Sequence, residues 1–296
     1  MTGRRRGAAG AAVTAALVWP QTHLMADAAR GFVFASKRGG HTEIFVQVSG
    51  SSPRQLTRNR ASDYGPVSSP DGRRIAFVSD RDGADDLYVV NLNGNGLRKL
   101  TRDSRQGSYD NAPAWSPDST RIAFASTRDG GEAKIYVMRA DGSGLRRLTR
   151  TARYVVDTTP SWSPDGKRIV FASNRAGFDN QELYVMRADG RHVLRLTRSR
   201  DDDGQPAWSP DGRRIAFVSR RDRNDEIYVM NADGTHPVRL TSTPREDEFL
   251  PRWSPSGEQL VFWSTAPGRA DRIWAIGADG TGRRLVATGS HADWLR

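Results

Sequence analysis

Acidic side chains recur at one fixed place along the sequence, three residues before a proline. They are Asp63, Asp110, Asp157, Asp203 and Glu248. Carboxylate oxygens are the ligands that Ca²⁺ and Mg²⁺ prefer in proteins. If the five acids gather at the mouth of one channel, they could bind a divalent cation or a basic peptide there.

Basic side chains recur with the same regularity, at the end of a Ser-x-Arg motif. They are Arg38, Arg81, Arg128, Arg175 and Arg221. Each series breaks once, because Gly289 stands at the sixth acidic place and Ala266 at the sixth basic place. If each base pairs with the acid of the following repeat, as Arg38 would with Asp63, the two gaps face each other. This coincidence favours ion pairs between neighbouring repeats over a ligand site, each worth ~1 kcal/mol if partly exposed.

These charges belong to a repeated unit that contains the element Trp-Ser-Pro. Its tryptophans are Trp115, Trp162, Trp208 and Trp253, and Ser68-Ser69-Pro70 is an earlier copy without tryptophan. A period of roughly 46 residues is typical of solenoids and propellers. In the copy that begins at Asp203, residues 206–209, 215–219, 226–230 and 238–241 read as four short strands joined by Asp-Gly hairpin turns. The unit therefore predicts a four-stranded antiparallel blade.

The repeat also resembles a known one. The pattern P-x-W-S-P-D-G-x-x-I-x-F-x-S-x-R-D-G, followed by I-Y-V-M-x-A-D-G and R-L-T, is similar to the WD40-like (PD40) repeat of TolB-like β-propeller proteins, over about residues 31–296. The resemblance implies a ring of blades and a partner in the cell envelope, such as a peptidoglycan-associated lipoprotein. The same blades occur in secreted lyases and in prolyl-oligopeptidase-type peptidases, so the fold alone does not decide the function.

Six second strands are visible, which predicts six blades. They begin at Phe32, Ile75, Ile122, Ile169, Ile215 and Leu260. The first unit starts in the middle of a blade, whereas residues 291–296 match a first strand. We therefore expect an all-β, six-bladed β-propeller spanning residues 29–296, in which the C-terminal strand completes the first blade. Such closure removes unpaired strand edges, which otherwise promote aggregation.

Residues 1–28 lie outside the repeats and have the layout of a signal peptide. Arg4-Arg5-Arg6 precedes an apolar run at 8–19, and Ala26-Asp27-Ala28 has the form of a cleavage site. The run is too short for a transmembrane segment. We expect a periplasmic or secreted protein; the alternative is that translation starts at Met25 and the protein is cytoplasmic.

The chain is basic, with a formal net charge of +11. Much of the excess recurs at fixed places, such as Arg73-Arg74, Lys167-Arg168, Arg213-Arg214 and Arg146-Arg147. Positive charge on an outer rim blocks strand pairing between molecules, which favours a monomer. The same charge could attract an anionic polymer. Nucleic acid is not expected, because no aromatic-plus-basic RNA motif and no reading helix is present.

The sequence shows no catalytic motif. It has no cysteine and no Gly-x-Ser-x-Gly nucleophile elbow. The five histidines are His23, His41, His192, His236 and His291, and none has paired metal-ligand spacing. His192 and His236 follow Asp-Gly hairpins, so we expect them at the surface, and the recurring tryptophans should pack between blades.

These observations favour a non-catalytic, exported scaffold that binds a protein in the cell envelope. We expect no cofactor, apart from the divalent cation considered at the channel mouth. The alternative is a secreted glycan lyase or hydrolase that uses the propeller channel.

Overall fold

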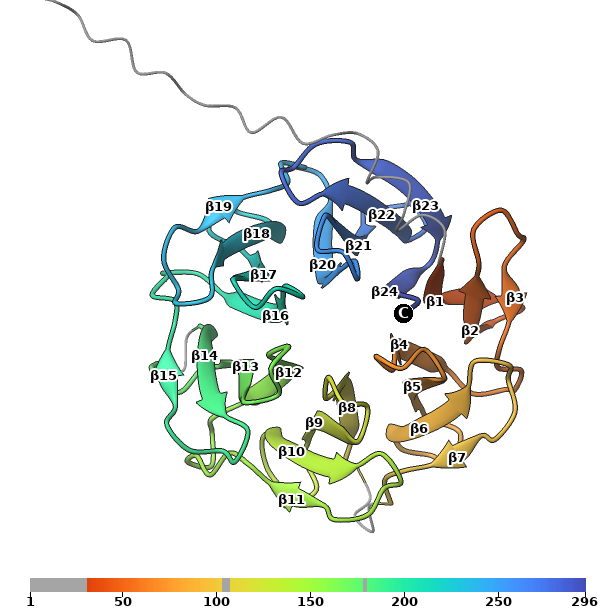
Figure 1. Ribbon diagram of the computed structural model, residues 1–296, viewed down its shortest axis with the longest axis horizontal. Coiled ribbons are helices and arrows are strands. Elements are labelled where there is room, and N and C mark those ends of the chain that lie inside the picture. Colours follow the sequence, from red (N-terminus) through yellow and green to blue (C-terminus); the bar gives the residue numbers. More distant parts are fainter. Residues whose placement is uncertain (1–30, 103–106, 178–179) are drawn as a thin grey trace, which may run out of the picture.

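The protein is a closed ring of β-sheets. The computed structural model describes residues 31–102, 107–177 and 180–296, and the predicted signal peptide lies outside them. Six four-stranded antiparallel sheets surround a central channel (Figure 1). The predicted six-bladed β-propeller is therefore confirmed.

Four of the blades, here called the regular blades, are consecutive in sequence and closely alike. In order from the channel outward, their strands are β4 (Asp63–Ser68), β5 (Arg74–Ser79), β6 (Asp86–Asn91) and β7 (Arg98–Lys99); β8 (Asp110–Trp115), β9 (Arg121–Ser126), β10 (Lys134–Arg139) and β11 (Arg146–Arg147); β12 (Asp157–Trp162), β13 (Arg168–Ser173), β14 (Glu182–Arg187) and β15 (Leu194–Arg195); β16 (Asp203–Trp208), β17 (Arg214–Ser219), β18 (Glu226–Asn231) and β19 (Val238–Arg239).

The other two, the seam blades, lie where the chain closes the ring. The last blade has β20 (Asp247–Trp253), β21 (Gln259–Thr265), β22 (Arg272–Gly277) and β23 (Arg284–Thr288), and the closing blade has β24 (Ser290–Trp294), β1 (Phe32–Arg38), β2 (His41–Gln47) and β3 (Arg54–Gln55). β24 pairs antiparallel with β1 and places Trp294 opposite Phe32. The predicted closure by the C-terminal strand is confirmed.

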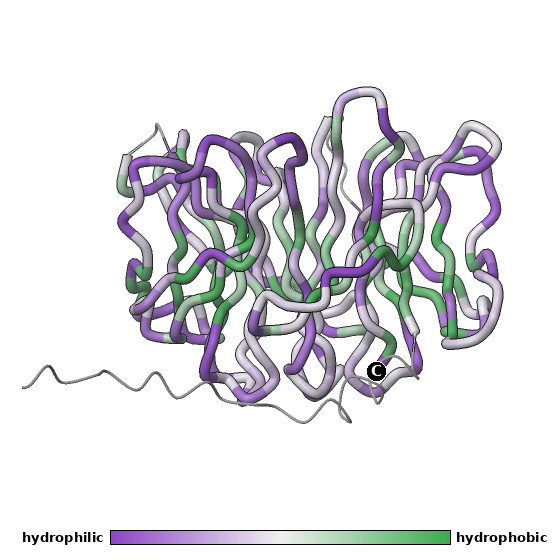
Figure 2. Tube along the Cα trace, turned by 90° about the horizontal axis from the view of Figure 1, so that it is seen from above, coloured by the Kyte–Doolittle hydropathy of each residue, from purple (hydrophilic) through white to green (hydrophobic). Residues whose placement is uncertain are grey.

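Burial of apolar side chains explains why the middle strands of each blade form. In β17, all residues from Ile215 to Ser219 are buried, so both faces of the strand are covered, as expected for a blade stacked between two others. Each apolar core joins neighbouring blades; one contains Val170 and Leu183 together with Trp208 and Phe217 of the next blade. Figure 2 shows the hydrophobic residues along the strands and hydrophilic residues in the loops at both ends. The predicted role of the tryptophans as blade-to-blade core is confirmed.

The inner strands are not regular. In each one the register shifts by a bulge, as between Gly204 and Ala207 in β16. The residue in the bulge has a positive φ, which is 52° for Gln205 and 51° for His291. Bulges re-aim side chains, and these residues line the channel.

Part of the basic excess serves a purpose other than the expected one. The guanidinium of Arg168 lies 4.7 Å from the ring centre of Trp208 in the next blade. Arg74, Arg121 and Arg214 repeat this contact with Trp115, Trp162 and Trp253. The expectation that such residues form an outer rim is wrong for these four, because they begin the second strand, near the channel. None of the described residues belongs to a helix suited to crossing a membrane.

Candidate functional site

The five acids begin the inner strands, and their side chains are buried. In the regular blades each acid forms an ion pair with the base of the Ser-x-Arg motif. The distances are 2.9 Å for Arg81 and Asp63, 2.7 Å for Arg128 and Asp110, 2.7 Å for Arg175 and Asp157, and 3.0 Å for Arg221 and Asp203. All four pairs lie within one blade. The prediction that each base pairs with the acid of the next blade is therefore wrong.

Strand pairing explains the register. Asp63 lies opposite Ser79 across β4 and β5. Arg81 follows two residues later, and its Nε donates to the Ser79 hydroxyl at 2.8 Å, which turns the guanidinium back over its own hairpin. The carboxylate of Asp63 is 0% exposed, so it is occupied by Arg81 and does not face an open channel mouth.

The seam blades each keep half of this pair. Ala266 and Glu248 fall in the last blade, and Gly289 and Arg38 in the closing blade, so the two gaps do not face each other. Glu248 instead lies 3.2 Å from Arg283, and the guanidinium of Arg38 lies 4.4 Å from the ring centre of Phe45.

Glu248 is also electrostatically different from the regular acids. Burial raises its pKa to about 7, although Arg283 acts in the opposite direction. Its Oε2 has no hydrogen-bond partner among the described residues. In the part of the chain that the structure describes, no group of three or more histidine or acidic side chains is arranged to hold a metal ion. The divalent-cation site therefore stays a prediction without a geometry.

The channel itself is the stronger candidate site, and one position per blade defines its middle. This channel ring consists of Val67, Ala114, Ser161, Ala207, Arg252 and Asp293. Two cavities of about 240 Å³ each lie along the channel. The N-end cavity is lined by the first residues of the inner strands, and the C-end cavity by the Trp-Ser-Pro elements. Arg252 lines both cavities.

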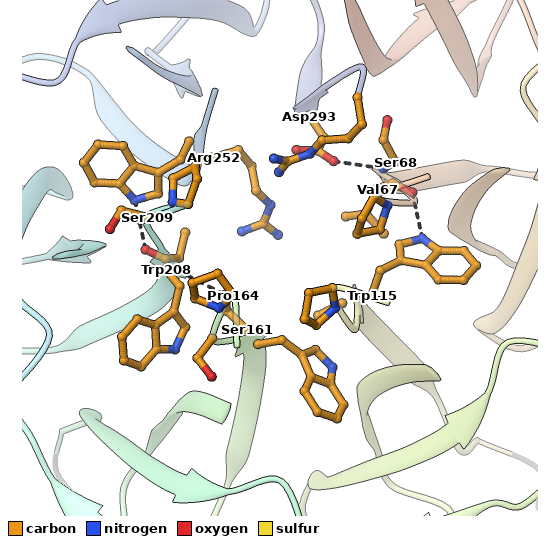
Figure 3. A pocket seen from close by; sticks show the side chains of 18 of the residues that line it. Val67, Ser68, Trp115, Ser161, Pro164, Trp208, Ser209, Arg252 and Asp293 are labelled. Carbon is orange, nitrogen blue, oxygen red and sulfur yellow. Dashed lines mark hydrogen bonds between the residues drawn. The ribbon is translucent and has the colours of Figure 1, made fainter. Parts of the chain in front are cut away.

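The two charged members of the channel ring come from the seam blades. Figure 3 shows Arg252 reaching into the channel and Asp293 beside Ser68. The Asp293 carboxylate accepts a hydrogen bond from the Ser68 backbone N–H at 2.9 Å. Burial lowers the pKa of Arg252 from its ordinary value, and the negative charge of Asp293 opposes this.

Aromatic side chains of the seam border the N-end cavity beside Arg252. These seam aromatics are Tyr64, Phe249, Trp263 and His291. Trp263 lies 4.7 Å from Phe249 and 5.2 Å from His291, measured between ring centres. Burial lowers the pKa of His291 to about 4, with a further contribution from Arg252. His291 is therefore neutral at pH 7.

Sequence reasoning missed Arg252, Asp293 and the seam aromatics. The available signal was their departure from the repeat: Arg252 and Asp293 stand where the other blades have Val67, Ala114, Ser161 and Ala207. His192 and His236 are exposed, as predicted, whereas His291 is in the channel.

The fold and the channel define the class of protein as a six-bladed β-propeller with a narrow central site. A family model described as the TolB beta propeller domain (PD40) matches residues 104–205, and one described as the Tricorn protease N-terminal beta propeller domain matches residues 178–293. The chain is a TolB-like β-propeller protein with PD40 repeats.

Individual relatives agree with this assignment. The Tol-Pal system protein TolB of Anaeromyxobacter dehalogenans is 40% identical over 75 residues, which is 25% of this chain and 17% of that protein. Putative TolB from Agrobacterium tumefaciens superposes with a TM-score of 0.70 at 26% identity, covering 79% of this chain and 83% of that one. TolB from Acinetobacter baumannii gives a TM-score of 0.76 at 22% identity, covering 91% and 67%. An oligogalacturonate lyase, at 16% identity and a TM-score of 0.56 over 88% of this chain and 73% of that one, shares the fold alone.

Proposed function

We propose that this propeller is an exported, non-catalytic module that binds a protein partner in the cell envelope. The observation that carries the proposal is the agreement between sequence and structure, because both relate the chain to TolB proteins. The sequence match spans 17% of the length of the first of these relatives. The partner therefore belongs to the proposal, and it is a protein of the peptidoglycan-associated lipoprotein type.

The make-up of the channel supports binding rather than acid–base chemistry. Four of its ring positions hold the uncharged side chains of Val67, Ala114, Ser161 and Ala207. His291 is stacked on Trp263 and has a pKa near 4, so it is a weak general base at neutral pH. These features favour the scaffold over the lyase or hydrolase alternative.

The proposed location rests on the leader. Residues 1–28 carry the charge, apolar run and cleavage site of a secretory signal. If this holds, the mature protein isolated from the periplasm or medium begins at Ala29. A cytoplasmic protein that begins at Met25 or Ala26 would overturn the export part of the proposal.

A direct binding measurement tests the function. The purified chain is titrated with the purified peptidoglycan-associated lipoprotein of the same organism, at low and then at moderate salt. We expect a stoichiometric complex that persists at moderate salt. Binding of anionic polymers alone, lost as salt rises, would contradict the proposal, as would turnover of a polyuronate substrate by the same preparation.

A further inference from the structure

Arg252 and Asp293 place opposite charges at one level of the channel without pairing fully with the protein. The described hydrogen bond of the Arg252 side chain is a long one, 3.4 Å from Nη1 to the Pro251 carbonyl. Asp293 is 3% exposed, and although its Oδ2 accepts from Ser68, its Oδ1 has no partner among the described residues. A buried charged group that lacks a partner is costly. A ligand that supplied both partners would remove that cost.

Such a ligand needs an anionic end and a cationic end close together. The guanidinium of Arg252 matches a carboxylate, which it can bind through two parallel hydrogen bonds. Oδ1 of Asp293 matches an ammonium group, which is a donor only. Because β20 and β24 belong to adjacent blades, the two charges can be met by one small molecule.

The neighbouring cavity indicates the rest of the ligand. Arg252 also lines the N-end cavity, whose wall includes Phe249 and Trp263. The indole Nε1 of Trp263 is buried and has no partner among the described residues. His291, which completes this wall, is neutral at pH 7 because its pKa is near 4. The wall is therefore aromatic and uncharged, and it suits an apolar side chain.

We propose that the channel binds a free α-amino acid with an apolar or aromatic side chain. Its carboxylate lies on Arg252, its ammonium group on Asp293, and its side chain in the N-end cavity against Phe249 and Trp263. A cavity of about 240 Å³ is smaller than the sites that hold drug-sized ligands. This site is separate from the proposed protein partner, and either proposal can fail without the other.

Calorimetric titration of the full chain with L-phenylalanine tests the proposal, with phenylacetate and phenethylamine as matched probes. Phenylacetate lacks the ammonium group and phenethylamine lacks the carboxylate. We expect L-phenylalanine to bind at least tenfold more tightly than either. Equal affinity for phenylacetate would show a simple anion site and overturn the proposal, as would no binding of L-phenylalanine at millimolar concentration.

Variants identify the two charges. Arg252→Ala introduces the residue found in the channel ring at Ala114 and Ala207, so the blade should still form. Asp293→Asn keeps an acceptor for the Ser68 N–H and removes the negative charge. Each should weaken L-phenylalanine binding tenfold or more, while Ser161→Ala, on the same ring, should leave it unchanged.

Folding is checked by thermal unfolding of each variant without ligand, and Arg252→Lys provides a second variant that keeps the positive charge. The lysine variant should bind more weakly than the parent and more tightly than Arg252→Ala, because it keeps the charge but not the paired hydrogen bonds. Unchanged affinity in a folded Asp293→Asn protein would overturn the assignment of the ammonium site.

Discussion

In each regular blade a buried aspartate is neutralised by the arginine of its own hairpin, and another arginine lies over the tryptophan of the following blade; neither arrangement is kept in the seam blades. Gln259 stands where Arg214 and its equivalents stand, and Gly31 occupies the same place in the closing blade. At the seam, apolar burial replaces these polar contacts. Trp294 is 0% exposed and Trp253 2%, against 7% for Trp208.

This difference shows what a ring needs at its point of closure. The regular blades are consecutive in the chain, so their neighbours are already close in the unfolded state. β24 and β1 come from opposite ends, and their pairing carries a larger loop-closure entropy. The ring packs Trp294 against Phe32, with ring centres 4.6 Å apart, and joins both to Val261 and Ile273 of the last blade. Seam positions freed from the repeat can then hold Arg252 and Asp293.

Removing residues 290–296 should give the largest effect. The deletion takes away β24, uncovers Phe32 and Phe34, and leaves β1 as an unpaired edge, which promotes aggregation. We expect loss of the cooperative thermal transition in calorimetry. Removing the exposed Arg296 alone is the control and should have little effect. An unchanged melting temperature after the longer deletion would show that β24 does not hold the ring closed.

Trp294→Ala should be the most damaging single substitution of this comparison. Truncating a buried tryptophan costs about 3–5 kcal/mol. The indole of Trp294 also donates to the Arg252 carbonyl at 3.1 Å, whereas Trp208 Nε1 has no partner among the described residues. Urea unfolding should therefore show a loss about 1 kcal/mol larger for Trp294→Ala than for Trp208→Ala. The reverse order would mean that the seam is no tighter than a regular blade.

Arg175→Ala and Arg38→Ala compare the same motif position in the two regions. Removing Arg175 leaves the buried Asp157 with hydroxyl donors from Ser173 and Thr151, and we expect a loss of about 3 kcal/mol. Arg38 is exposed and contacts the ring of Phe45, so its loss should cost about 0.5–1 kcal/mol. Similar losses in urea unfolding would remove the distinction between the regions.

Glu248→Gln should change how stability depends on pH. The pKa of Glu248 is about 7 in the folded protein, above its ordinary 4.5, so folding favours the protonated carboxyl. Its contribution is full below pH 4.5 and is lost as the pH rises through 7, by up to about 3 kcal/mol at pH 8. Relative to the parent, Glu248→Gln should thus be more stable at pH 8 than at pH 5.

Asp157→Asn is the matched control, because it removes the ion pair with Arg175 in a regular blade. It should be less stable than the parent at both pH values. The same difference between Glu248→Gln and the parent at pH 5 and pH 8 would show that Glu248 does not titrate in this range.

Sequence reasoning reached the fold because a propeller repeats its local physics. Apolar runs such as 215–219 and the turn at Gly212, whose φ is 70°, determine each blade without information from the others. It reached closure because residues 291–296 supply the strand that the first unit lacks. It failed on the ion pairs because a periodic sequence places Asp63 at a suitable spacing from both Arg38 and Arg81.

The sequence by itself determined the number of blades, their strand order and the closure, since these follow from hydrophobic periodicity and turn residues along the chain. Only the tertiary structure decided which arginine meets which acid, because that depends on how a hairpin folds back on itself. It also decided that Arg252, Asp293, Trp263 and His291 face one another. These residues come from strands at both sides of the seam, and a side chain's neighbours across a ring are set by packing in space rather than by distance along the chain.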